Sequence, residues 1–213
     1  MYINNKTLAI IGAGDLGIQL AHYAIKDNHY RDVVFIDDVI DAKEVYGWPV
    51  IGKTHQILDF FEEKRFDEII IGIGYKHLDI RKSFYDELHL KIPFGRIIHS
   101  ASFIDPSVDI EEGCVIYPSC SLDINSKIGA NTILNNGCTI SHDSSIGTHC
   151  FLSPRVALAG FVNIGEGCNL GINSTIIDNI TICKSSQLGG GTVVIRDIKE
   201  PGLYVGNPAR MIK

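Results

Sequence analysis

A histidine–aspartate pair, His142 and Asp143, lies eighteen residues before a glycine, Gly160. Imidazole is the side chain that most often serves as a general base. Glycine lets a ligand approach the backbone closely, and its N–H group can bond a carbonyl oxygen that gains negative charge during attack. If the fold stacks these positions, a base and an oxyanion donor lie together, as acyl transfer requires. The alternative is a surface histidine without a chemical role.

A second candidate site is the glycine-rich stretch Gly12-Ala13-Gly14-Asp15-Leu16-Gly17, which follows an apolar strand and opens a helical segment. Such a turn offers free backbone N–H groups and the positive end of a helix dipole to a phosphate. Asp37 and Asp38 end the next strand, where a carboxylate can accept hydrogen bonds from ribose hydroxyls. Gly72-Ile73-Gly74 ends a third strand. The alternative is a tight turn that needs glycine for its backbone alone.

Two cations follow Gly74. Lys76 and Arg81 could assist a diphosphate, but we expect them to be solvated charges on an exposed helix face.

An unbroken six-residue repeat positions His142 and Gly160. Every sixth residue is aliphatic at seventeen successive positions: Ile98, Ile104, Ile110, Ile116, Leu122, Ile128, Leu134, Ile140, Ile146, Leu152, Leu158, Ile164, Leu170, Ile176, Ile182, Leu188 and Val194. This period predicts a parallel β-helix in which three hexapeptides make one coil. Residue 160 then lies one coil from residue 142, at about 4.8 Å along the stack. Gly129, Gly147, Gly165, Gly171 and Gly189 each follow a repeat residue, and we expect corners there.

The same register explains most of the six cysteines. Five lie two residues before an aliphatic repeat position, in a column otherwise filled mainly by small side chains: Cys114, Cys120, Cys138, Cys150 and Cys168. Free cysteine behaves as a small hydrophobe, so we predict packing rather than redox or nucleophilic chemistry. No Cys/His spacing is typical of a zinc site.

The first part of the chain alternates strands and helices, which predicts a parallel sheet with helices packed on it. We expect strands at 8–11, 33–36, 68–71 and 96–98, a helix that follows Gly17 and runs to about Lys26, and helices at 58–64 and 78–88. Residues 1–96 then form an α/β, Rossmann-like half domain, and residues 97–213 form the β-helix with a C-terminal tail. A region of this size is one mononucleotide-binding half, so a nucleotide diphosphate fits it better than NAD.

Composition excludes several classes of function. The net charge of −6 argues against a nucleic-acid or anionic-membrane binder. There is no apolar stretch near twenty residues, so we expect no membrane span. The polar N-terminus (Tyr2, Asn4, Asn5, Lys6) is unlike a secretory signal, and a cytoplasmic location follows as the default.

Several motifs together resemble the NeuD/PglD family of sugar O/N-acyltransferases. They are the hexapeptide register, Ser141-His142-Asp143, Ala159-Gly160, Leu170-Gly171-Ile172-Asn173, Leu188-Gly189-Gly190-Gly191, the 205–210 tail, and the glycine and Asp37-Asp38 motifs. The resemblance covers nearly the whole chain. It implies a left-handed β-helix and a homotrimer, with acetyl-CoA lying between neighbouring β-helices.

The resemblance also implies roles for individual residues. His142 would be the general base, Asp143 its acidic companion and Gly160 the donor to the acetyl carbonyl. Acetyl-CoA would lie along Gly160, Gly171, Gly189, Gly190, Asn207, Pro208 and Arg210. The nucleotide would be held by Gly12, Gly14, Asp15, Leu16, Asp37, Asp38, Gly72 and Gly74. Several relatives carry a histidine at the position of Phe151, so any polar role there is absent from this chain.

These features predict an acetyl-CoA-dependent N-acetyltransferase acting on a UDP-, dTDP- or GDP-linked 4-amino-4,6-dideoxy sugar, without a metal. Sialic-acid-type O-acetylation is the alternative within the enzyme class. A non-catalytic nucleotide-sugar-binding scaffold leaves the base and the glycine unexplained. A γ-carbonic-anhydrase-like zinc enzyme lacks its histidine set here, and an NAD oxidoreductase is disfavoured by the short first domain.

Overall fold

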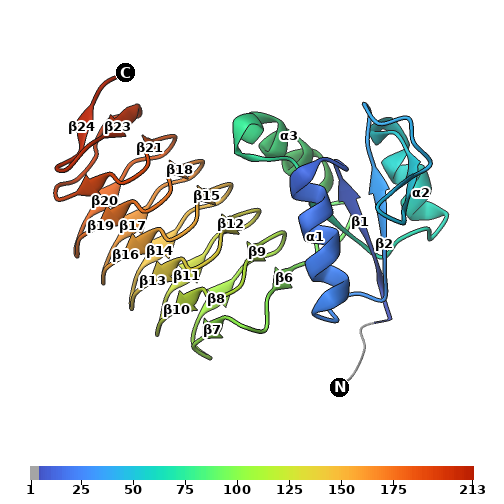
Figure 1. Ribbon diagram of the computed structural model, residues 1–213, viewed down its shortest axis with the longest axis horizontal. Coiled ribbons are helices and arrows are strands. Elements are labelled where there is room, and N and C mark those ends of the chain that lie inside the picture. The colour runs from blue at the N-terminus through green and yellow to red at the C-terminus, as the bar shows by residue number, and fades with distance from the viewer. Residues whose placement is uncertain (1–4) are drawn as a thin grey trace. The chain divides into compact units, whose positions relative to one another are not determined.

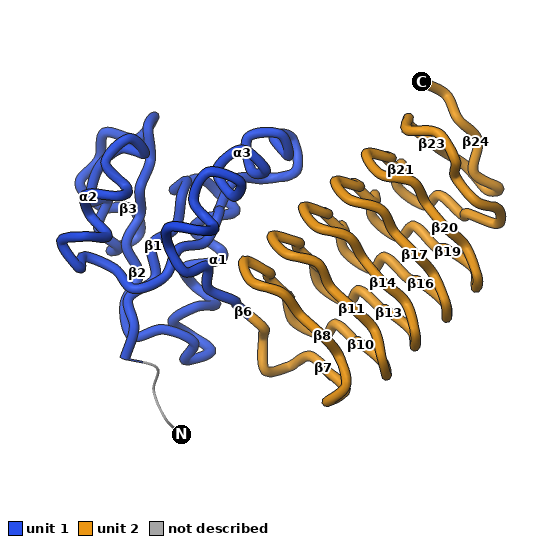
Figure 2. The backbone as a smooth tube through the Cα atoms, turned by 180° about the vertical axis from the view of Figure 1, so that it is seen from behind, with its two compact units in different colours: residues 1–97 blue, residues 98–213 orange. Residues whose placement is uncertain are grey.

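The computed structural model describes residues 5–213. The chain folds as two compact units, residues 1–97 and 98–213 (Figure 2). Tyr2 and Asn4, two of the polar N-terminal residues considered above, lie outside the described residues. Among the helices of the described part, none is long and apolar enough to cross a membrane.

The first unit is built on a five-stranded sheet with the order β3-β4-β2-β1-β5 (Figure 1). Its strands are β1 (Thr7–Ile11), β2 (Asp32–Ile36), β3 (Glu44–Val45), β4 (Trp48–Gly52) and β5 (Glu68–Ile71). Its α-helices are α1 (Asp15–Lys26), α2 (Ile57–Glu62) and α3 (Leu78–Leu88). Short 3₁₀ turns precede α2 and α3, at Thr54–Gln56 and Tyr75–His77. β1 is paired on both sides and almost entirely buried, which matches its continuous apolar sequence.

The sequence missed the strand pair at the edge of this sheet. β4 pairs in parallel with β2, while β3 pairs with β4 antiparallel, so the sheet is mixed. The turn between them has positive φ at Tyr46 and Gly47. The two strands alternate poorly between apolar and polar residues and include Pro49, which hid them. The expected strand at 96–98 is not part of this sheet: Phe94 makes a single bridge to Ile69, and β6 (Ile97–Ile98) begins the next fold.

The second unit is a parallel β-helix with three sheets (Figures 1 and 2). Sheet I comprises β7 (Phe103–Ile104), β10 (Ser121–Leu122), β13 (Thr139–Ile140), β16 (Ala157–Leu158), β19 (Thr175–Ile176) and β22 (Val193–Val194). Sheet II comprises β8 (Asp109–Ile110), β11 (Lys127–Ile128), β14 (Ser145–Ile146), β17 (Asn163–Ile164) and β20 (Thr181–Ile182). Sheet III comprises β6, β9 (Val115–Ile116), β12 (Ile133–Leu134), β15 (Phe151–Leu152), β18 (Asn169–Leu170), β21 (Gln187–Leu188), β23 (Leu203–Val205) and β24 (Arg210–Met211).

Each β-helix strand pairs in parallel with the strand eighteen residues away, as the period predicts. Ile140, for example, is level with Leu122 on one side and Leu158 on the other. The aliphatic side chains of the six-residue repeat, called the ladder below, fill the interior, and the column of cysteines lies beside them. All five cysteines of that column are buried, as expected from packing, while Cys183 is half-buried.

The corners are built differently from the expectation. Left-handed φ values recur every six residues from Gly113 to Gly191, three positions after the repeat residue, at Asn125, Asp143 and Phe161 among others. The glycines that directly follow the ladder have no positive φ; Gly147 is one of them. A Cβ on Gly147 would lie 2.7 Å from the backbone nitrogen of Glu166 in the next coil. These glycines are required because neighbouring coils approach closely, whereas the turn itself lies two residues later.

The C-terminal tail closes the last coil. β23 extends sheet III beside β21, and β24 folds back antiparallel to β23. Tyr204 and Ala209 pack against the interior of the β-helix, and Ala209 N–H bonds the carbonyl of Val193 at 2.8 Å. A chain end of repeated coils needs such a cover, because the last coil has no neighbour to bury its inner face.

Candidate active site

His142 lies on the corner between sheets I and II, two residues after β13. The next residue, Asp143, has φ 56°, which bends the chain so that its carboxylate returns toward the imidazole. His142 Nδ1 and Asp143 Oδ2 are 3.0 Å apart, and both side chains are partly exposed. In a straight strand the two side chains would point to opposite faces, so the left-handed corner makes this pairing possible.

A third residue completes this arrangement and was missed from the sequence. Asn125 Nδ2 donates to Asp143 Oδ1 at 3.1 Å, from the equivalent corner one coil earlier. The hydrogen bond from His142 and the hydrogen bond from Asn125 hold the pKa of the Asp143 carboxyl below its usual value. Asp143 is therefore ionised near neutral pH and can accept Nδ1–H, which leaves the Nε2 lone pair of His142 free. The eighteen-residue spacing from 125 to 143 was the available signal.

Gly160 occupies the position predicted for it, one coil along from His142. Ile140 pairs with Leu158, so the two corners coincide. The imidazole lies against the glycine, since an added Cβ would be 2.6 Å from its Cε1 and Nε2 atoms. The N–H groups on either side, of Ala159 and Phe161, bond to carbonyls of adjacent coils. Among the described residues, the N–H of Gly160 has no acceptor. A free backbone donor beside a positioned base is the arrangement that acyl transfer needs.

The buried cysteines offer no alternative nucleophile. A hydrogen bond to the Cys120 thiol, together with burial, raises the pKa of the Cys138 thiol. The pKa of the Cys150 thiol is raised in the same way, by a hydrogen bond to Cys168 and by burial. The partner thiols of Cys120 and Cys168 have a lowered pKa because of the same hydrogen bonds, but all four thiols are buried in the β-helix, where they are poorly placed to attack a substrate.

The residues expected along acetyl-CoA lie on two different corners. Gly160 is on the corner between sheets I and II, whereas Gly171, Gly189 and Gly190 are on the corner between sheets III and I. Asn207 and Pro208 form a turn closed by a cis peptide bond, and Gly206 in that turn accepts the N–H of Val193. A cavity of about 410 Å³ beside this turn is lined by the tail, including Pro208 and Arg210, and by residues 195–198. One chain does not bring Gly160 and the second corner together.

Phe151 also lies away from His142. It belongs to β15 in sheet III, and its side chain is buried. Nine residues are half a coil, so this position and the base are on different sides of the same coil.

In the first unit, the glycines of the expected phosphate loop divide into two kinds. A Cβ on Gly17 would lie 1.9 Å from the carbonyl oxygen of Gly12, and one on Gly72 would lie 2.8 Å from Gly17 Cα. Gly12 has φ +96°, so these three glycines form a close backbone contact. At Gly14 and Gly74, in contrast, an added Cβ meets no atom of the described chain within 4 Å. Gly14 and Gly74 border open space where a ligand can approach.

Gly14 precedes α1 and has no side-chain cap. The first N–H groups of α1 therefore remain available to an anion, while Asp15 and Leu16 form its first turn. Asp15 adds a negative charge there, so the backbone must supply the attraction for a phosphate.

Asp37 and Asp38 are both engaged with the protein itself. Asp37 accepts N–H bonds from Ala13 at 2.8 Å and from Val39 and Ile40 at 2.8 Å each. Partial burial acts to raise the pKa of Asp37, but these three N–H bonds outweigh it and lower the pKa. Asp38 accepts the N–H and the hydroxyl of Thr54 at 2.8 and 2.6 Å. Asp37 thus holds the glycine loop in place through Ala13, a link that the sequence did not reveal.

Arg81 contradicts the expectation of a solvated surface charge. Its side chain is buried, and its Nη1 donates to the carbonyls of Ile71 and Ile73 at 2.7 and 2.9 Å. It therefore holds the backbone on both sides of Gly72. Lys76 is exposed, as expected.

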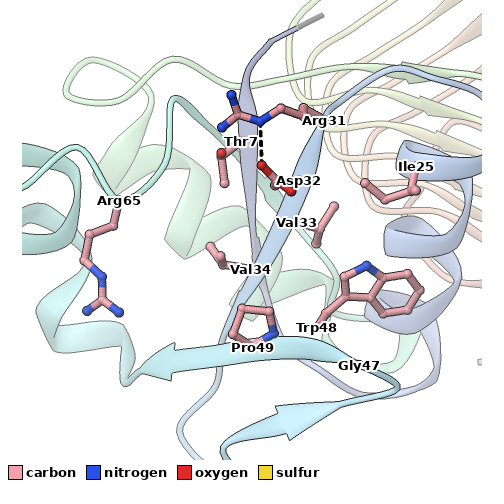
Figure 3. A pocket seen from close by; sticks show the side chains of 10 residues that line it. All are labelled: Thr7, Ile25, Arg31, Asp32, Val33, Val34, Gly47, Trp48, Pro49 and Arg65. Carbon is pink, nitrogen blue, oxygen red and sulfur yellow. Dashed lines mark hydrogen bonds and ion pairs between the residues drawn. The ribbon is translucent and has the colours of Figure 1, made fainter. Parts of the chain in front are cut away.

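A separate cavity of about 460 Å³ lies beside the start of β2 (Figure 3). Arg31 at its rim is paired with Asp32, and the Arg65 guanidinium lies 4.5 Å from the centre of the Phe60 ring. The cavity is at the amino ends of β1 and β2, whereas Gly14 and Asp37 follow their carboxyl ends. It contains none of the residues singled out from the sequence. Across the described residues, no group of three or more His, Cys, Asp or Glu could hold a metal ion.

Comparisons with known proteins find similarity over the first unit and over the whole fold. Residues 7–88 match the family model for the PglD N-terminal domain. The acetyltransferase domain of PglB from Neisseria gonorrhoeae, solved with acetyl coenzyme A, is 28% identical, with a TM-score of 0.90 over 98% of this chain and 100% of that one. A mutant of perosamine N-acetyltransferase from Caulobacter crescentus, solved with CoA and GDP-perosamine, is 26% identical, with a TM-score of 0.89 over 100% and 98%.

WeeI from Acinetobacter baumannii shares the fold, with 24% identity and a TM-score of 0.81 over 97% of this chain and 99% of that one. A search of curated proteins finds no match. The fold and the site define a left-handed β-helix acyltransferase with an N-terminal Rossmann-like half domain. The first unit carries the PglD N-terminal domain, and the chain as a whole is similar to sugar N-acetyltransferases of the kind that its motifs predicted.

Proposed function

We propose that the chain transfers acetyl from acetyl-CoA to the amino group of a nucleotide-linked 4-amino-4,6-dideoxy sugar. The observation that carries the proposal is the His142 imidazole, held by Asp143 at Nδ1 and lying against Gly160, whose N–H is free among the described residues. The similar PglB domain was solved with acetyl coenzyme A, and the similar perosamine N-acetyltransferase with CoA and GDP-perosamine.

In this mechanism the sugar amine attacks the thioester carbonyl directly. A new N–C bond forms while the C–S bond breaks, and CoA leaves as its thiol once the sulfur gains a proton. His142 Nε2 takes the proton that the amine loses, and the Gly160 N–H bonds the oxygen as it becomes negative. Asp143 keeps the imidazole in the tautomer that leaves Nε2 unprotonated.

The two units divide the work in this proposal. Residues 1–96 bind the nucleotide, with the diphosphate at the start of α1 near Gly14 and Gly74. The engaged carboxylates of Asp37 and Asp38 retain free lone pairs for ribose hydroxyls, in addition to their structural bonds. Residues 97–213 carry the acetyl transfer. The substrate panel described below compares UDP, dTDP and GDP as the nucleotide carrier of the sugar.

We further propose a homotrimer whose active sites lie between subunits. The proposed acetyl-CoA residues occupy two corners of the β-helix, which a single elongated cosubstrate cannot reach on one chain without crossing a sheet. Two adjacent copies can present one corner each to the same CoA. The substrates, acetyl-CoA and a nucleotide sugar, indicate a cytoplasmic role in making surface-polysaccharide sugars.

The test is a thiol-release assay with acetyl-CoA and a panel of UDP-, dTDP- and GDP-linked 4-amino-4,6-dideoxy sugars, with the product identified by mass. We expect one acceptor to gain an acetyl group on nitrogen. His142→Asn should lower kcat by about 10²–10⁴-fold, the usual contribution of a general base. Full turnover by this variant would contradict the mechanism. Acetylation of a hydroxyl on free sialic acid would replace the proposed acceptor with the O-acetylation alternative.

A further inference from the structure

Phe161 is the residue that neither folding nor the proposed chemistry accounts for. It directly follows Gly160, and its φ is +58°. This left-handed region is unfavourable for a bulky side chain and favours glycine and asparagine. The equivalent corners of the described coils hold small or polar residues: Gly113, Ser119, Asn125, Asn131, Gly137, Asp143, His149, Arg155, Gly167, Asn173, Asn179, Ser185 and Gly191. Only here, among the described corners, is the side chain wholly apolar.

The ring of Phe161 is also poorly buried. It is 54% exposed, so the β-helix gains little from packing it. Its one described ring contact is with the imidazole of His142, at 5.1 Å between centroids and an angle of 88°. An edge-to-face contact of this kind is favourable and fixes the relative orientation of the two rings. An exposed apolar ring in an unfavourable backbone conformation, held against the base, indicates a ligand surface.

The position of the ring indicates which substrate it meets. From Leu158 in sheet I, the chain passes Gly160 and then Phe161 before it reaches Asn163 in sheet II. Within one chain, Gly171, Gly189 and Gly190 lie beyond the far end of sheet I, whereas Phe161 leads away from the base into sheet II. The outward residues of sheet II are polar throughout: Asp109, Lys127, Ser145, Asn163 and Thr181. A polar face next to one exposed aromatic ring suits a carbohydrate, which has hydroxyl groups around an apolar C–H face.

We propose that Phe161 is the wall of the acceptor site: its ring packs against the C–H face and the 6-methyl group of the amino sugar. This role rests on the proposed function and adds to it a residue that selects a deoxy sugar. By packing against both the sugar and His142, the ring sets the angle at which the amine meets Nε2. Phe161 is a positioning residue and takes no proton.

The test compares Phe161→Asn with Phe161→Tyr. Asparagine occupies the same corner with a left-handed φ at positions 125 and 179, so the backbone accepts it. We expect Phe161→Asn to raise the KM for the acceptor by about 5- to 10-fold, the value of one lost ring contact, and to leave the KM for acetyl-CoA unchanged. It should also lose preference for the 6-deoxy acceptor over the same sugar with a 6-hydroxyl. Phe161→Tyr keeps the ring and should restore the acceptor KM.

A second measurement makes the result independent of turnover. Calorimetric titration gives the Kd of each UDP-, dTDP- and GDP-linked amino sugar for the wild type and for Phe161→Asn. If the wild type shows no transfer but the variant binds the sugar more weakly, the proposed function fails and the role of Phe161 stands. An unchanged Kd and acceptor KM overturn the role of Phe161, whatever the activity. A rise in the acetyl-CoA KM alone would also overturn this role and would indicate that Phe161 contacts CoA. A smaller native mass of the variant would overturn it too and would indicate a contact between subunits.

Discussion

His142 depends on neighbours that lie in three successive coils. Asn125, Asp143 and Gly160 come from equivalent corners of these coils; Asp143 and Gly160 contact the imidazole, and Asn125 acts through Asp143. Asn125 orients the carboxylate, the carboxylate orients Nδ1, and the missing side chain at 160 leaves room for the ring. The geometry of the base is therefore a product of the coil spacing.

A methyl group at position 160 should remove the space in which the imidazole lies. In Gly160→Ala, the Cβ would be 2.6 Å from Nε2 and Cε1, so the ring must rotate away from the free N–H. The backbone accepts alanine, because φ at 160 is not in the left-handed region. We expect kcat to fall by about 10-fold or more, since small displacements of a catalytic group are costly, with little change in Tm. Steady-state kinetics and thermal melting check both expectations.

Gly147→Ala is the matched control for that variant. Its Cβ would meet backbone 2.7 Å away in the next coil, where no side chain can rotate. We expect a loss of about 1–3 kcal/mol in the free energy of unfolding, as for other overpacked sites. If Gly160→Ala instead destabilises the fold as much as Gly147→Ala and keeps the wild-type kcat, the proposed contact between His142 and Gly160 has no catalytic importance.

The glycine loop of the first unit shows how an element positions a site through backbone contacts. Gly12, Gly17 and Gly72 bring the loop, α1 and the end of β5 together, while Asp37 and Arg81 hold the loops from either side. Gly14 and Gly74 contribute nothing to this contact. The glycine motifs therefore contain some glycines that the backbone contact requires and others that border open space.

Alanine substitutions should separate these two kinds of glycine. Gly14→Ala places a methyl group in the open space before α1, so we expect weaker binding of UDP, dTDP or GDP by about 10-fold or more and a nearly unchanged Tm. Gly17→Ala places a Cβ 1.9 Å from a carbonyl oxygen and should lower Tm sharply. Calorimetric titration and thermal melting measure the two effects. Normal nucleotide binding by Gly14→Ala would mean that the phosphates bind elsewhere.

The elements differ in how far the sequence specifies them. The six-residue period predicted the β-helix, its eighteen-residue register and the stacking of Gly160 on His142, because large inward side chains mark every strand. The hairpin of β3 and β4 was missed, since its two exposed strands have no clear alternation. Arg81 was predicted to be solvated but is buried. A single charged residue in an amphipathic helix does not reveal from the sequence whether backbone carbonyls lie near enough to accept its hydrogen bonds. Asn125 was missed although the register contained it.

The left-handed corners explain another difference. The turn was expected at the glycines that directly follow the repeat residues, but it lies two residues later, at Gly, Asn, Ser, Asp, His, Arg and Phe residues. Closing the coil imposes a left-handed backbone once per hexapeptide, three residues after the repeat residue. This requirement overrides the preference of a residue such as Arg155 or Phe161 for negative φ. This is why the pairing of Asp143 with His142 could not be derived from local sequence, and why Phe161 drew no attention there.

At the scale of the whole molecule, the two corners of the proposed CoA site lead us to expect that activity requires the proposed assembly. His142→Asn removes the base from the corner between sheets I and II. Gly190→Val blocks the corner between sheets III and I, where the added side chain would contact Ile172. If one site takes its two corners from neighbouring copies, a mixed assembly contains sites with both corners intact even though neither variant has any.

Mixing the two variants tests this directly. Each alone should be inactive, but co-expressed in equal amounts they should recover roughly a quarter of wild-type activity, the fraction of sites with an intact corner from each of two randomly chosen copies. The native mass measured on the same samples should equal three chains. Sites built within one chain would give no recovery at any mixing ratio, because no single chain then carries both intact corners. If activity is recovered but the native mass does not equal three chains, the site is shared between subunits in an assembly that is not a trimer.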